Sequence, residues 1–134
     1  MNNQFGVSQY QKVGVESGVN SSNSHNLVTM LFDGLLEKLA RGAGAIARGN
    51  VSEKGEALGS AIKIVDGLRA SLDYDKGGEI ASNLAAMYDY MERRLLEAST
   101  NSDAEIVAEV VSLVKQIKTG WDAIPADLRE LRSA

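Results

Sequence analysis

Few side chains in this sequence have the types and spacing that chemistry requires. The chain has no cysteine and one histidine, His25, which excludes thiolate sites and the multi-histidine sets typical of metal enzymes. Asp73, Asp75 and Gly78 are spaced like the start of a calcium-binding loop, but Leu84 stands where that loop needs a bidentate glutamate. We therefore expect no metal ligand, no cofactor and no catalytic residue.

His25 itself has one chemical alternative. A lone histidine in a helical protein suggests a phosphorelay domain, whose reactive imidazole projects from the middle of a helix beside a basic residue. His25 instead lies between Ser24 and Asn26, where we expect the first turn of a helix. The sequence favours an exposed histidine without a catalytic role, and a phosphorelay module remains the competing hypothesis.

Composition predicts a small helical protein. The 134 residues fit one domain, and 44% are hydrophobic while only 5% are aromatic, with a single proline. The net charge is -4 and the basic residues are scattered, which argues against nucleic acid as a partner. No apolar run approaches the roughly 18 residues of a membrane span. We expect a soluble, cytoplasmic protein without direct membrane insertion.

Four amphipathic segments with apolar residues at intervals of three and four predict four helices. The first begins at Asn23 or Ser24 and ends at Arg48; the others cover about residues 51–72, 79–99 and 103–124. Capping boxes are predicted for Asn50 with Glu53 and for Ser102 with Glu105. Because the connections are short, neighbours must run antiparallel. The expected fold class is all-α, an antiparallel up-down-up-down four-helix bundle over residues 23–125.

Glycine is unusually frequent inside these predicted helices. Each such residue costs about 0.5 to 1 kcal/mol relative to alanine, so the first two helices should be the softer pair. Close contact between helices would explain the glycines, as would movement when a partner binds; we favour contact. The glycines concerned are Gly34, Gly42, Gly44, Gly55, Gly59 and Gly67.

The ends of the chain differ from the bundle in composition. Residues 1–22 are rich in Asn, Gln, Ser and Gly, yet apolar side chains recur from Phe5 to Val19. Such a segment can dock on a partner or simply pack on its own domain. We expect a mobile N-terminal docking or capping segment at residues 1–22 and a surface tail at residues 126–134.

Several blocks of sequence resemble the flagellin-specific secretion chaperones of bacterial flagella. The similarity extends from Tyr10 to about Ile124, and the blocks follow in the order and spacing of that family. They are LVTMLFDG at 27–34, LRASLD at 68–73, KGGEIASNL at 76–84, MYDYM at 87–91 with RRL at 93–95, and VGVES at 13–17, with Trp121 near the end.

The resemblance implies a protein that is not an enzyme. It implies a bundle that binds the disordered C-terminal region of flagellin, prevents premature polymerisation and presents the subunit to the flagellar type III export gate. The family's apolar-x-x-Tyr element for export-gate docking falls on Val7 and Tyr10. Oligomeric state stays open, a homodimer included. For flagellin binding we predict exposed apolar positions on the second and third helices: Ile62, Val65, Leu84, Tyr88 and Met91. Periodicity alone would equally place several of them in the core of the bundle.

Overall fold

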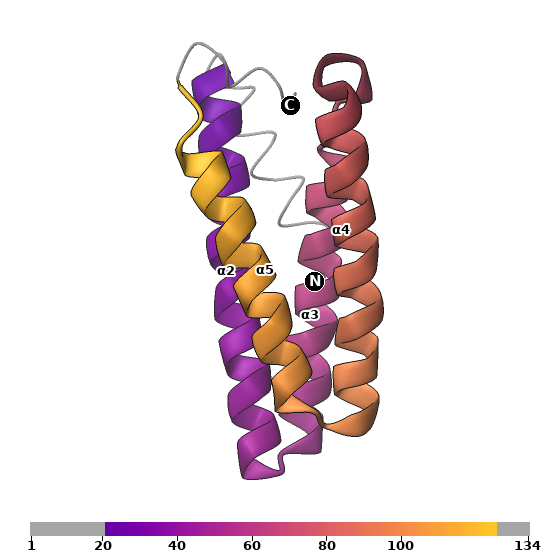
Figure 1. The fold of residues 1–134 in the computed structure, drawn as a ribbon. Helices are drawn as coiled ribbons and strands as arrows, with labels where there is room; N and C mark the ends of the chain where they lie inside the picture. The colour runs from indigo at the N-terminus through magenta and orange to yellow at the C-terminus, as the bar shows by residue number, and fades with distance from the viewer. Residues whose placement is uncertain (1–20, 126–134) are drawn as a thin grey trace.

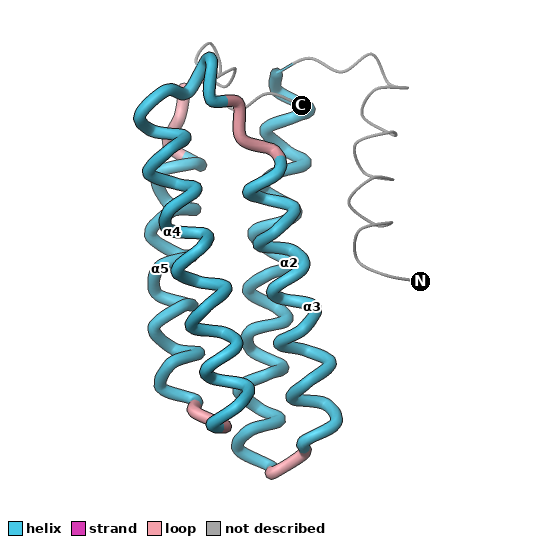
Figure 2. The backbone as a smooth tube through the Cα atoms, turned by 90° about the vertical axis from the view of Figure 1, so that its right-hand side faces the viewer, coloured by secondary structure: helices cyan, strands magenta, loops and turns pink. Residues whose placement is uncertain are grey.

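A computed structural model of the chain describes residues 21–125 (Figure 1). This part contains four helices and no strand: α2 (Ser21–Arg48), α3 (Val51–Ala70), α4 (Tyr74–Asn101) and α5 (Ala104–Asp122). Short connections join successive helices at the two ends of the bundle (Figure 2). α2 packs against α3 and α5, and α4 packs against the same two helices. The predicted antiparallel four-helix bundle is confirmed. Its first helix begins at Ser21, two residues before the predicted start, while residues 1–20 of the expected N-terminal segment and the tail lie outside the described residues.

The turn between α2 and α3 forms as the sequence predicts. Gly49 leaves the helix with φ 68°, a left-handed conformation that glycine adopts at little cost. Asn50 then caps α3, because its side-chain oxygen accepts a hydrogen bond from the Glu53 backbone N–H at 3.0 Å. The Glu53 carboxylate accepts from the Asn50 side-chain amide at 3.4 Å. The capping pair is confirmed, although Glu53 bonds the side chain of Asn50.

The start of α4 differs from the prediction. We expected the helix at Glu79, but its first turn begins at Tyr74, because the Asp73 side chain accepts hydrogen bonds from the backbone N–H groups of Asp75 and Lys76. Gly78, at φ 50° and ψ -122°, then kinks the helix before it continues. The predicted break is therefore a kink within one helix. The cap of that helix, Asp73, is the first residue of the calcium-loop-like sequence.

The cap of α5 is Asp103, so the prediction of Ser102 was wrong. The Asp103 carboxylate accepts from the N–H groups of Glu105 and Ile106 at 2.9 and 3.4 Å. Ser102 instead ends α4 in the left-handed conformation, with φ 50° and ψ 47°. A charged cap also suits the positive end of the α5 dipole better than a hydroxyl.

One continuous core fills the bundle. Most of its largest fully buried side chains come from α2, α3 and α4, and α5 adds three valines, Ile106 and Trp121. α2 and α3 lie close together at Gly42, where an added Cβ would lie 2.4 Å from Leu58 Cδ2. Gly42 thus supports the contact explanation. Gly55 and Gly59 do not, because an added Cβ there would meet nothing within 4 Å.

Candidate functional site

The sequence-predicted binding residues fall into three groups. Val7 and Tyr10 lie outside the described residues. Ile62 and Leu84 are half-buried and pack against the edge of the core. Val65, Tyr88 and Met91 are completely buried, so the expectation that these three are exposed was wrong. Periodicity alone places an apolar residue on one helical stripe, and this stripe also faces the core.

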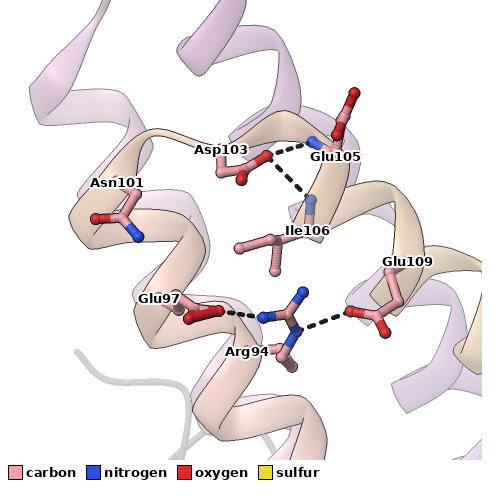
Figure 3. A pocket seen from close by; sticks show the side chains of 7 residues that line it. All are labelled: Arg94, Glu97, Asn101, Asp103, Glu105, Ile106 and Glu109. Carbon is pink, nitrogen blue, oxygen red and sulfur yellow. Dashed lines mark hydrogen bonds and ion pairs between the residues drawn. The ribbon is translucent and has the colours of Figure 1, made fainter.

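Near the turn at Ser102, α4 and α5 are held together by polar side chains (Figure 3). Arg94 Nε donates to Glu109 Oε1 at 2.8 Å, and Tyr90 Oη donates to Glu109 Oε2 at 2.6 Å. Arg94 also pairs with Glu97. The hydrogen bond from Tyr90, followed by that from Arg94, lowers the pKa of Glu109. The bonds from Tyr90 and Arg94 to Glu109 favour its ionised form and link α4 to α5 at this end.

An open pocket of about 550 Å³ lies beside this cluster. Arg94, Glu97 and Glu109 line it together with residues around the α5 cap, and Ile106 contributes an apolar wall (Figure 3). None of the residues that line it is a serine, threonine, lysine or histidine that these carboxylates could activate as a nucleophile. Across residues 21–125 no set of three His, Asp or Glu side chains is placed to hold a metal ion. The pocket therefore gives no support to an enzymatic reaction.

At the opposite end, side chains of α5 bond to α2. Trp121 Nε1 donates to Thr29 Oγ1 at 3.1 Å and to the His25 carbonyl at 3.3 Å. Lys118 Nζ lies 3.5 Å from Asp33 Oδ1. Figure 1 shows the result: α5 runs obliquely from α4, near Ser102, towards α2 at its C-terminal end.

His25 belongs to this attachment, so the expectation of an exposed first-turn histidine was wrong. α2 begins at Ser21, and His25 is 4% exposed. Its ring stacks on Trp121 with the centroids 4.1 Å apart and the planes within 9°. Contact with α5 stabilises the early turns of α2 beyond what local capping predicts. A buried, stacked imidazole also lacks the solvent access that a phosphorelay histidine requires.

α5 is thus bonded to α4 near Ser102 and to α2 near Trp121. Between these two contacts, α4 and α5 each have an apolar edge. On α4, Ile80 and Met87 precede Arg94 at intervals of seven residues, so they lie on the side that Arg94 uses to reach α5. On α5, Leu113 and Ile117 follow Glu109 at intervals of four. We call these residues, with Leu84, the α4–α5 apolar strip.

The side chains of the α4–α5 apolar strip are only partly covered. Ile80 is 57% exposed. Leu84, Leu113 and Ile117 are partly buried and lie against the core. Because α5 leans towards α2 here, the described part of α4 leaves this edge available to an apolar partner. Leu84 was predicted as a binding residue and Ile80 was not, although the seven-residue spacing from Ile80 to Arg94 places Ile80 on this side of α4.

The sequence is similar to known proteins over most of its length. The family model for Flagellar protein FliS matches residues 6–128. The chain belongs to the FliS family.

The chain is similar to several members of this family. It is 48% identical over 120 residues to the flagellar secretion chaperone FliS of Salmonella typhimurium, covering 89% of each chain. It is 45% identical over 118 residues to the flagellar secretion chaperone FliSB of Pseudomonas aeruginosa, covering 88% of this chain and 94% of that relative. With FliS of Vibrio cholerae the identity is 37% over 125 residues, covering 93% and 92% of the two chains.

The predicted family is confirmed, and FliS proteins are chaperones of flagellar secretion, not enzymes. A secretion chaperone needs a partner protein in flagellar export. No helix within residues 21–125 is long and apolar enough to cross a membrane.

Proposed function

We propose that this FliS-family chain is a cytoplasmic chaperone for the C-terminal region of flagellin. It binds that region before export, prevents premature polymerisation and delivers the subunit to the flagellar type III export gate. The observation that carries the proposal is the α4–α5 apolar strip, an apolar surface that the tilted α5 covers only in part. Membership of a secretion chaperone family supplies the cellular context.

The strip suits an amphipathic helix. An extended or helical segment of flagellin would lay its apolar face along Ile80 and Leu84 on one side and Leu113 and Ile117 on the other. Burying apolar surface contributes about 25 cal/mol per Å². Contacts that flagellin subunits otherwise make with each other are thereby replaced by contacts with the chaperone. Release requires no nucleotide, because export removes the unfolded cargo.

The predicted cargo residues take different parts in this proposal. Leu84 contacts the cargo directly. Tyr88 and Met91 follow it on α4 and, with Val65, form the buried layer behind the strip; cargo reaches them only if α5 moves. We place Ile62 outside the proposed cargo site, because it lies on the flank of α3 that continues from Arg69, away from α5.

Titration of the full chain with a peptide of the flagellin C-terminal region tests the proposal. Leu84→Glu should weaken binding by about tenfold or more, which corresponds to about 1.4 kcal/mol. Ala86→Glu is the matched control, because Ala86 is exposed on the outer side of α4 and should bind normally. Absence of binding by the unchanged chain at micromolar concentration contradicts the proposal.

Export-gate docking is assigned to Val7 and Tyr10, in the segment 1–22. Tyr10→Ala should leave cargo affinity mostly intact while it weakens capture of the loaded chaperone by the export-gate component. An equal loss of cargo affinity would move Tyr10 to the cargo site. Filament assembly of flagellin provides a second readout, since the unchanged chain should delay it at equimolar concentration.

A further inference from the structure

The C-terminal half of α5 is bonded to α2 by polar groups as well as by apolar packing. Trp121 Nε1 donates to Thr29 Oγ1 at 3.1 Å and to the His25 carbonyl at 3.3 Å, and the indole stacks on the His25 ring. Three residues earlier, Lys118 Nζ lies 3.5 Å from Asp33 Oδ1. We call these five residues the Trp121 attachment. Because hydrogen bonds are directional, it fixes where this end of α5 lies on α2.

The buried end of the Trp121 attachment is the stronger one. Trp121 is 6% exposed and His25 4% exposed, so water screens the hydrogen bonds of the indole very little. In the pair of Lys118 with Asp33 the side chains are 27% and 62% exposed, and exposed ion pairs contribute little to stability. Trp121 is therefore the main residue that keeps the end of α5 on α2.

The apolar edges of α4 and α5 lie level with each other beside this attachment. The bond between Arg94 and Glu109 sets the register of the two antiparallel helices. Counted from that bond, Ile117 of α5 is level with the segment between Leu84 and Met87 of α4. Ile117 is also one helical turn from Trp121, so a shift of the attached end moves this part of the α4–α5 apolar strip directly.

The hydrophobic effect opposes the Trp121 attachment. Ile80 is 57% exposed, and Leu84, Leu113 and Ile117 are only partly buried. Movement of α5 towards α4 would bury more of this apolar surface, which is favourable in water. The bonds to α2 hold α5 in the oblique position that Figure 1 shows, and so keep the two apolar edges from closing on each other.

We propose that Trp121 is a positioning residue for cargo binding. Through its bonds to Thr29 and His25 it holds α5 against α2 and keeps the α4–α5 apolar strip open. The inference rests on the proposed function, because it takes the strip as the site for flagellin. Without Trp121 the strip closes in most molecules, and the apparent affinity for cargo falls in proportion to the fraction that stays open. Trp121 acts through the position of α5 and makes no contact with the cargo.

Titration of the full chain with the flagellin C-terminal peptide tests the consequence for binding. Trp121→Leu removes the stack and both hydrogen bonds, and should weaken binding by about tenfold. Thr29→Val keeps the shape of the side chain and removes one acceptor, so it should weaken binding by about threefold. Circular dichroism checks that both variants keep their helicity.

Thr100→Val is the matched control for Thr29→Val. Thr29 Oγ1 donates to the carbonyl of His25, four residues earlier, at 3.1 Å, and Thr100 Oγ1 donates to the carbonyl of Leu96 in the same way at 2.9 Å. Thr100 is exposed on α4. Thr100→Val should therefore bind the peptide normally, and any general effect of losing a helical threonine hydroxyl would affect both variants.

A distance between α4 and α5 tests the position of α5 without cargo. The chain has no cysteine, so Ser82→Cys and Thr119→Cys, both at exposed positions, provide the two thiols for spin labels. In this background the distance between the labels should shorten in Trp121→Leu and, to a smaller extent, in Thr29→Val. Addition of the peptide should restore the longer distance. A purely structural role of Trp121 would lower the free energy of unfolding without shortening this distance.

The two measurements distinguish the ways in which the inference can fail. A distance that is unchanged or longer in Trp121→Leu overturns it, as does a shorter distance with undiminished peptide affinity. If Trp121→Leu loses helicity, Thr29→Val decides by the same two criteria. If the unchanged chain binds no peptide while the distance shortens as expected, the proposed function fails and the control of α5 by Trp121 stands.

Discussion

At the scale of single residues, the same residue type serves different purposes on neighbouring helices. Gly42 is required by the close approach of α3, since Leu58 occupies the space of its missing side chain. Gly120 faces open space on α5. In the sequence both are glycines that weaken a helix. Only the distance from each glycine to the neighbouring helix shows that their roles differ.

Substitution of these two glycines by alanine should change stability in opposite directions. Gly42→Ala should lower the free energy of unfolding by about 1 to 3 kcal/mol, because Leu58 is fully buried and has little room to move. Gly120→Ala should raise it by about 0.5 to 1 kcal/mol through helix propensity. Urea unfolding measures both. Equal effects of the two substitutions would show that Gly42 does not set the distance between α2 and α3.

The burial of His25 could not be predicted from the residues around it. Its neighbours Ser24 and Asn26 indicate a polar helix start, which predicts exposure. The residue that covers it, Trp121, lies 96 positions further along the chain. Local sequence carries no signal of that pairing, so both the start of α2 and the burial of its histidine were missed.

At the scale of elements, helix identity was predictable and helix ends were only partly so. Four stripes at intervals of three and four gave the four helices. Asn50 was found because it is the single good cap beside Gly49. Ser102 and Asp103 are both good N-caps. Which of them caps α5 depends on the residue at which α4 ends. The end of α4 is set by the packing of α4 and α5, and neither Ser102 nor Asp103 determines it by its residue type.

The contact between α4 and α5 should weaken in acid. The hydrogen bond from Tyr90 and that from Arg94 lower the pKa of Glu109 below its ordinary value. Glu109 therefore contributes stability above the pKa it has in the unfolded chain, about 4.3. This contribution is lost as the pH falls through the lower folded pKa. The free energy of unfolding should decrease over that range.

Glu109→Gln isolates this contribution. The glutamine still offers Tyr90 an acceptor but cannot titrate, so the variant should be less stable at pH 7 and lose less stability on acidification. Urea unfolding at a series of pH values from neutral to below 4 measures the difference. Parallel curves for the two proteins would show that the cluster in Figure 3 does not couple α4 to α5.

At the scale of the whole molecule, the tilt of α5 decides which apolar residues are core and which are surface. Tyr88 and Met91 were predicted as binding residues because they share a stripe with Leu84. They are buried because α4 and α5 are close near Ser102, while Leu84 lies where α5 turns towards α2. Periodicity identifies the stripe, but the depth of each residue depends on the angle between two helices. That angle is not a local property of either sequence segment.

Two exposed aliphatic residues of α4 allow the proposed cargo surface to be tested against a matched control. Ile80 is 57% exposed on the α4–α5 apolar strip, and Leu96 is 58% exposed on the same helix, away from the strip. Ile80→Glu should weaken flagellin-peptide binding by about tenfold, because it places a charge on the apolar strip. Leu96→Glu should bind the peptide normally. The two variants are matched in exposure and in chemistry, so general damage to the fold would affect both proteins, and circular dichroism checks the helicity of each. Equal losses of affinity in the two variants would show that the strip does not bind the cargo.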